Sequence, residues 1–105
     1  MRGVLDLCVL ARLRAGEAYG YELARALDAA GFGEIKGGTL YPLLSRLERD
    51  RLVTTSWRTS DLGPDRKYYR LTVTGEETLN AAGAAGLEFA AAAHALLAEP
   101  SEAAP

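Results

Sequence analysis

The residues of this chain best suited to binding chemistry gather between positions 37 and 53. Four leucines recur here at the spacing of one helical face, and we expect that face to be buried. These are Leu40, Leu43, Leu44 and Leu47. The opposite face then carries small and polar side chains with cations beside them, which is typical of a helix that enters the major groove of DNA. The side chains expected on or beside that face are Tyr41, Pro42, Ser45, Arg46 and Arg49.

The start of this helix is predicted from Pro42. Proline has no N–H to donate, so it fits best in the first turn, where the N–H groups have no helical partner. Thr39 is then expected as the N-cap, with Gly37 and Gly38 forming the turn before it. The predicted recognition helix spans residues 39–50.

A second group of cations follows, in a predicted β-hairpin. β-branched and aromatic residues alternate over residues 53–58 and again over 67–73, with turn-forming residues between them. Arg66 and Lys67 come just after the loop, where they would meet a phosphate backbone or the adjoining minor groove. We expect Trp57 to pack the hairpin against the core and Tyr69 to be structural, while the role of Tyr68 stays open.

Two helices are expected before the recognition helix. Residues 3–14 form a helix that is apolar on most sides, including Val4, Leu7 and Cys8, so it should be buried on more than one side. A second helix opens at Tyr19 and runs to about Ala30, followed by a glycine-rich connection. Three helices and a hairpin in this order predict a mainly α, α+β fold, the winged helix-turn-helix.

The last predicted helix starts near Thr74, which forms a capping-box pattern with Glu77, and runs to residue 98. Two apolar seams fit it equally well, one through Phe89 and the other through Ala90, so a partner helix is expected. The residues expected to meet a partner are Val4, Leu7, Cys8, Leu79, Gly86, Phe89, Ala90, Ala93 and Leu97. We divide the chain into a winged-helix domain (1–74), a C-terminal helix that packs against a partner (75–98) and a tail (99–105).

Charge is distributed unevenly along the chain, whose net charge is −2. Residues 1–35 hold four Lys and Arg against five Asp and Glu, residues 36–70 hold eight against four, and residues 71–105 hold none against five. A basic middle segment is what a DNA contact requires, although a chance imbalance on a solvated surface would give the same totals.

The sequence gives little support for an enzyme or a metal protein. It has no Ser/His/Asp set and no phosphate-binding glycine motif followed by lysine. His94 and Cys8 are the single residues of their types, so no metal site and no cofactor are expected, with Cys8 in the core and His94 exposed or interfacial. One cysteine, no membrane-spanning run and no signal peptide favour the cytoplasm.

Residues 19–75 resemble the PadR family of transcriptional regulators, in its short subtype with one C-terminal helix. The ordered motifs that carry the resemblance are Tyr19-Gly-Tyr-Glu22, Gly38-Thr-Leu-Tyr-Pro-Leu-Leu-Ser-Arg-Leu-Glu48, Leu52-Val53, Trp57, Pro64-Asp-Arg-Lys-Tyr-Tyr-Arg-Leu-Thr72 and Thr74-Gly75. The resemblance implies a homodimeric repressor, in which the last helix packs against the first and last helices of the partner.

The resemblance also implies roles for individual residues. Tyr41 and Pro42 would touch the groove, and Tyr19 would reach a phosphate. With Arg49 from the helix pattern, the predicted DNA-binding set is Tyr19, Lys36, Thr39, Tyr41, Pro42, Ser45, Arg46, Arg49, Arg66 and Lys67. Many members release DNA when a small, often aromatic or cationic, ligand binds near the dimer interface, so a small-molecule effector is a further implied partner.

The chain departs from the family pattern in two places. Arg51 stands where the family usually has Gly, and Arg there would either lose roughly 1 kcal/mol in a left-handed conformation or shift the end of the helix. The last helix has no Trp, so a ligand site of stacked tryptophans is not supported. The alternative function is a winged-helix adaptor that binds protein instead of DNA, and the basic helix face and hairpin argue against it.

Overall fold

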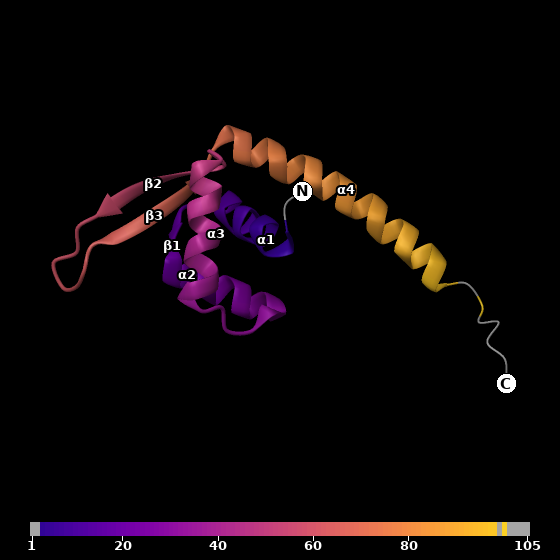
Figure 1. The fold of residues 1–105 in the computed structure, drawn as a ribbon, viewed down its shortest axis with the longest axis horizontal. Helices are drawn as coiled ribbons and strands as arrows, with labels where there is room; N and C mark the ends of the chain where they lie inside the picture. Colours follow the sequence, from indigo (N-terminus) through magenta and orange to yellow (C-terminus); the bar gives the residue numbers. More distant parts are fainter. Residues whose placement is uncertain (1–2, 99, 101–105) are drawn as a thin grey trace.

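In the part of the chain that the structure describes, residues 3–98 and 100, a small sheet lies to one side of a group of helices (Figure 1). In this computed structural model the elements are α1 (Val4–Arg14), β1 (Ala18–Tyr19), α2 (Gly20–Leu27), the π-helical turn η1 (Asp28–Phe32), α3 (Gly37–Arg49), β2 (Val53–Arg58), β3 (Arg66–Leu71) and α4 (Val73–Leu97). Figure 1 shows α1, α2 and α3 at the centre, the β2–β3 hairpin on one side and α4 on the other. This arrangement confirms the predicted winged helix-turn-helix.

The sheet has β3 at its centre, with β1 and β2 antiparallel on either side. The β2–β3 hairpin is the wing of the fold. In it Val53 pairs with Leu71 and Arg58 with Arg66, so β2 and β3 are paired along their whole length. The sequence does not predict β1, because two residues are too few to show a period. The expectation that Val73 lies in the second wing strand is wrong, because that residue begins α4 and is 76% exposed.

The hydrophobic core lies among the first three helices and the base of the sheet. The four leucines predicted for the buried face of α3 are all 5% exposed or less. They pack with Val9, Leu10, Leu13, Ala18, Leu23, Leu27, Leu52, Val53, Tyr69 and Leu79. The core therefore fixes which face of α3 is turned outward.

The recognition helix α3 begins two residues earlier than predicted. Lys36 is its N-cap, and the Lys36 carbonyl accepts hydrogen bonds from the N–H groups of Thr39 and Leu40 at 2.9 and 3.0 Å. The expectation of Thr39 as N-cap is therefore wrong. Gly37 and Gly38 adopt helical conformation, and Pro42 lies in the second turn, where its missing N–H leaves only the carbonyl of Gly38 without its helical donor.

A tight junction joins α3, the wing and α4. The N–H of Leu52 donates to the Leu47 carbonyl and the N–H of Arg51 to the Glu48 carbonyl, each at 3.0 Å. These two bonds make a Schellman motif, which requires a left-handed residue after the helix. Arg51 takes that conformation with φ of 60°, so of the two alternatives the left-handed residue is the one observed and the helix end is not shifted.

The helix α4 is capped by Thr72, so the capping box predicted for Thr74 and Glu77 is wrong. Thr72 Oγ1 accepts from the N–H of Gly75 at 2.9 Å and donates to the Arg51 carbonyl at 2.8 Å. A side chain at Gly75 would collide with the Leu52 carbonyl oxygen and lie 2.8 Å from Leu71 Cδ1. Glycine is therefore the residue that lets α4 start this close to the junction.

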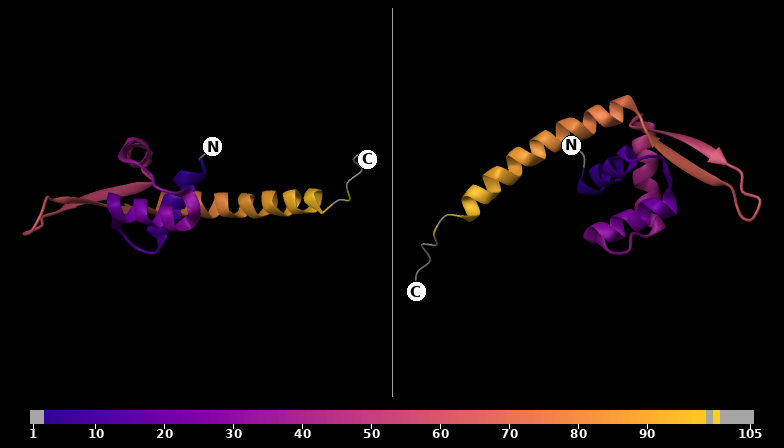
Figure 2. Two further views of the ribbon diagram at one scale, coloured as in Figure 1. Left: turned by 90° about the horizontal axis from the view of Figure 1, so that it is seen from below. Right: turned by 180° about the vertical axis from the view of Figure 1, so that it is seen from behind.

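Beyond its first turns, α4 leaves the body of the molecule. Leu79 is buried in the core, and Arg14 Nη2 donates to Asn80 Oδ1 at 2.8 Å. Both views in Figure 2 show the rest of α4 projecting away from the other helices. Among the described helices, none is long and apolar enough to cross a membrane. Of the predicted tail, residues 99 and 101–105 lie outside the described residues.

Candidate nucleic-acid interface

The residues that the sequence pattern predicts for the outer face of α3 are all exposed, but they lie in two groups on different sides of that face. Tyr41 and Ser45 face the wing, where they line a recess between α3 and β2–β3. Thr39, Pro42 and Arg46 face the start of α1 instead. Lys36 is exposed at the N-cap, and Arg49 is exposed near the C-terminal end. The predicted contacts of α3 therefore form a band along the helix.

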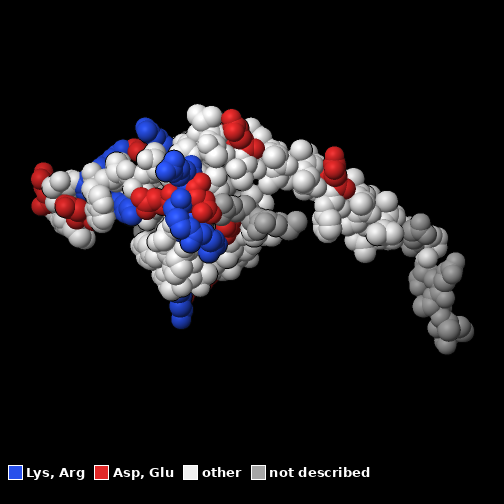
Figure 3. Space-filling model, turned by 45° about the horizontal axis from the view of Figure 1, so that its top comes forward, with Lys and Arg blue, Asp and Glu red and all other residues white. Residues whose placement is uncertain are grey.

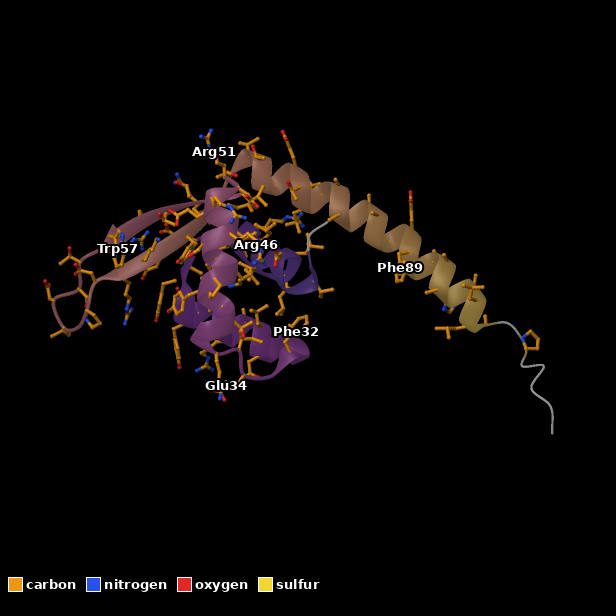
Figure 4. The ribbon with its side chains drawn as sticks, in the orientation of Figure 1. Phe32, Glu34, Arg46, Arg51, Trp57 and Phe89 are labelled. Carbon is orange, nitrogen blue, oxygen red and sulfur yellow. The ribbon has the colours of Figure 1, made fainter. Side chains whose placement is uncertain are left out.

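Arg46 is tied to α1 by an ion pair that the sequence does not predict. Its Nη2 atom lies 2.9 Å from Oδ1 of Asp6, whose side chain is only 7% exposed. Figure 4 shows Arg46 on α3 at the side where α1 lies. The side chain of Arg49 is 71% exposed and lies 3.3 Å from the Asp50 carboxylate. Arg49 is thus the arginine of α3 with the greater freedom to reach a phosphate.

Glu48 joins α3 to the wing. Its carboxylate accepts a hydrogen bond from Thr55 Oγ1 on β2 at 2.8 Å and another from Lys67 Nζ on β3 at 3.1 Å. Both hydrogen bonds hold the pKa of Glu48 below its ordinary value of 4.5, and the bond from Thr55 has the larger effect. The predicted phosphate contact Lys67 is therefore also a structural residue, which positions the wing against the recognition helix.

On the face of the sheet opposite Lys67, two arginine side chains lie over tyrosine rings. The guanidinium of Arg66 lies 4.6 Å from the ring centre of Tyr19, and that of Arg58 lies 4.1 Å from the ring centre of Tyr68. The Tyr19 and Tyr68 rings meet edge to face at 5.4 Å. These contacts give Tyr68 a structural role, and they show that Arg66 and Lys67 point to opposite faces of β3, as neighbours on a strand do.

The recess between α3 and the wing brings together five of the ten predicted DNA-binding residues. It has a volume of about 380 Å³ and is lined by Tyr19, Gly20, Tyr41, Ser45, Trp57, Asp65, Arg66, Lys67 and Tyr69. Burial raises the pKa of the Tyr69 phenol above its ordinary value of 10.0. The recess combines cations and hydroxyl donors with aromatic walls.

The expectation that Trp57 packs the wing against the core is wrong. Its side chain is 67% exposed, whereas Val53 on the same face of β2 is buried and Thr55 is half-buried. Residue 57 lies where the hairpin extends away from the body of the molecule, so the indole stays largely exposed (Figure 4). Sequence alternation predicts the correct face, but it does not tell how far the core extends under the strand.

The surface around the interface is mixed in charge. Figure 3 shows Lys and Arg over α3 and the wing, with Asp and Glu interspersed, and a tip of the wing that is acidic. The tip loop contains Asp61 and Asp65. Several central cations are already paired within the chain, so the basic segment presents less free positive charge than its sequence total suggests.

The described residues contain no cluster of His, Cys, Asp or Glu that would hold a metal ion. Cys8 is partly buried and packs against the core, in keeping with the expectation of a core thiol. His94 is exposed on α4.

A recognition helix with an exposed polar face, a wing joined to it and a projecting C-terminal helix define a winged helix-turn-helix protein. The sequence model of the transcriptional regulator PadR-like family matches residues 9–81. The chain belongs to this family.

Individual relatives agree with this assignment. A transcriptional regulator of Mycobacterium tuberculosis is 36% identical over 78 residues, covering 74% of this chain and 71% of the relative. The crystal structure of a PadR-like transcriptional regulator from Bacillus cereus is 36% identical and superposes with a TM-score of 0.84, over 93% of this chain and 95% of the other. That of a PadR family regulator from Eggerthella lenta has 36% identity and a TM-score of 0.82, over 94% and 86%. The protein is therefore a DNA-binding transcriptional regulator and not an enzyme.

Proposed function

We propose that this protein is a cytoplasmic repressor that binds a pseudo-palindromic operator as a homodimer and responds to a small-molecule effector. The observation that carries the proposal is the exposed apolar surface of α4, in a chain whose helix α3 presents an exposed polar face suited to DNA. Repression and effector response rest on the family resemblance, whereas the dimer and the DNA contacts rest also on the geometry described above.

The dimer is supported by the exposed apolar surface of α4. Phe89, Leu96 and Leu97, which share one side of α4 because they are spaced by seven and eight residues, are each 74% exposed or more. Monomeric proteins seldom leave a continuous apolar surface in water, so a second copy is the cover we propose. The small residues Gly86, Ala90 and Ala93 would let two helix backbones approach closely.

The helix α1 supplies the other side of the proposed interface. Val4 is 66% exposed, Leu7 is half-buried, and Cys8 is half-buried against the core of its own chain. Leu79 differs from the rest of the predicted interface, because it is 7% exposed and already belongs to the core of its own chain. We therefore leave Leu79 out of the proposed interface.

The proposed DNA contacts are the ten residues predicted from the sequence, with unequal weight. Lys36 and Tyr41 are exposed, and Arg49 is 71% exposed beside Asp50, whereas the less exposed Arg46 and Lys67 must share their charge with Asp6 and Glu48. A two-fold dimer would place its two recognition helices about 34–36 Å apart, in successive major grooves. The operator should then contain two inverted half-sites about one helical turn apart.

Selection of bound duplexes from a random pool tests the operator directly. The enriched sequences should be inverted repeats with this spacing, bound by the purified dimer. Affinity for a selected duplex should fall steeply with salt, and Arg49→Ala should reduce the slope of log K against log salt by about 1 if one phosphate contact is lost. A folded dimer that binds no duplex at low salt would reject the proposal and favour the adaptor function.

A further inference from the structure

Trp57 stands out as a large aromatic side chain that the fold does not use. It is the single tryptophan of the chain and is 67% exposed. In the wing it lies opposite Lys67, so the two side chains share one face of the hairpin. Because Lys67 on that face reaches Glu48 on α3, the indole is on the side of the wing that faces the recognition helix.

The recess beside Trp57 has one wall from each DNA-reading element. Tyr41 and Ser45 come from α3, and Trp57 and Lys67 come from the wing. The wall groups include two hydroxyls, an amine, an indole N–H and an apolar indole face, and the lining also contains the carboxylate of Asp65 and the guanidinium of Arg66. This chemistry matches a sugar–phosphate backbone, which presents anionic oxygens and the apolar face of a deoxyribose side by side.

We propose that Trp57 packs against a deoxyribose of the DNA strand that passes between α3 and the wing, with Lys67 and Ser45 at the adjoining phosphate. The inference rests on the DNA binding described above and adds a contact that the predicted set lacks. The sugar is the same in every nucleotide, so Trp57 contributes affinity without sequence preference. Its exposure in the free protein follows, because the surface that covers it belongs to the DNA.

The single tryptophan makes a direct test available, since all indole emission comes from Trp57. The full-length protein is titrated with a mixed-sequence duplex of about 30 base pairs at about 50 mM salt, where backbone contacts dominate binding. Anisotropy of a dye on the DNA reports binding, and indole emission is followed in parallel with unlabelled DNA. We expect the emission to be quenched or shifted to shorter wavelength, saturating together with the anisotropy.

The two signals separate the possible failures. Saturated anisotropy with unchanged indole emission would overturn the Trp57 contact and leave DNA binding intact. No rise in anisotropy would overturn the DNA proposal itself, and the Trp57 contact with it.

Substitutions give an independent test. Trp57→Ala should weaken binding to selected and mixed duplexes alike, by about fivefold to tenfold, with an unchanged unfolding midpoint because the residue is exposed. Trp57→Phe should retain part of the affinity, because it keeps an aromatic face. Leu62→Ala is the matched control, since Leu62 is fully exposed in the wing loop, and it should change little. Wild-type affinity in Trp57→Ala, or a loss confined to one sequence, would overturn the inference.

Discussion

Arg51 shows how a single backbone angle is imposed by its neighbours. Its left-handed conformation lets the N–H groups of Arg51 and Leu52 close the end of α3, and its carbonyl accepts the Thr72 hydroxyl. In any residue other than glycine, this conformation brings Cβ too close to the backbone, which raises the free energy of the folded state. Arg51 keeps this conformation because α3, the wing and α4 meet at the junction, and the hydrogen bonds between them form only with this turn.

Replacement of Arg51 by glycine should therefore stabilise the protein. We expect the free energy of unfolding to rise by about 1 kcal/mol, because the strain is relieved, although part of the gain is offset by the greater freedom of glycine in the unfolded chain. Urea unfolding followed by circular dichroism measures the change. Arg51→Ala is the control, since it removes the charge and keeps the Cβ; equal stability of the two variants would contradict the role of strain.

At the scale of elements, α3 is held from both flanks by polar contacts. Asp6 binds Arg46 from α1, and Thr55 and Lys67 bind Glu48 from the wing. The leucines of α3 fix its buried face, and these contacts fix its direction relative to its neighbours. The orientation of the reading helix thus depends on residues that need not touch DNA.

The pair between Asp6 and Arg46 should contribute to folding as well as to binding. Arg46→Ala removes the cation beside a buried carboxylate, so we expect a loss of about 1–2 kcal/mol of unfolding free energy, less than for a fully buried pair because Arg46 is 43% exposed. Arg49→Ala should change stability by less than about 0.5 kcal/mol. A double-mutant cycle with Asp6→Ala isolates the coupling, and additive losses would show that the two side chains do not interact.

The contacts of Glu48 predict a pH dependence for the wing. The pKa of Glu48 is lowered in the folded protein, so its stabilising effect is present above the ordinary value of 4.5 and is lost as the pH falls through the folded value. The side chain is 39% exposed, which limits the effect to about 1 kcal/mol. Urea unfolding at several pH values should show a shallower acid loss in Glu48→Gln than in the wild type. Parallel curves would assign the acid loss to other carboxylates.

The sequence predicts the helices and the wing well, because their patterns are local. The leucine period defines α3, and alternation defines β2 and β3. The sequence does not predict contacts between residues that are far apart along the chain. Asp6 and Arg46 are 40 residues apart, and nothing in either neighbourhood indicates that they meet. Pro42 predicts a later helix start because its usual place is the first turn, but Gly37 and Gly38 before it are part of the helix.

The whole molecule is elongated, 67 Å along its longest axis, because α4 extends away from the core. Phe89→Ser and Leu97→Ser together should weaken self-association by at least about tenfold, since each would lose a buried apolar contact worth about 1–3 kcal/mol. Sedimentation over a range of concentrations measures it.

Two further variants sharpen this test of the dimer. Leu62→Ser is the control, because Leu62 is fully exposed at the other end of the molecule. Truncation after Ala82 keeps Leu79 and Asn80 in place, so the domain should stay folded and become monomeric. A truncated chain that still sediments as a dimer would show that α4 is not the dimerisation element.

The position of α1 has a consequence for any effector of the proposed dimer. Its exposed Val4 faces outward, and two residues later Asp6 holds the reading helix. A ligand that shifts α1 at the interface would change the free energy of the DNA-bound orientation of α3. Thermodynamic linkage then requires reciprocity: the operator must change the affinity for that ligand by the same factor by which the ligand changes the affinity for the operator.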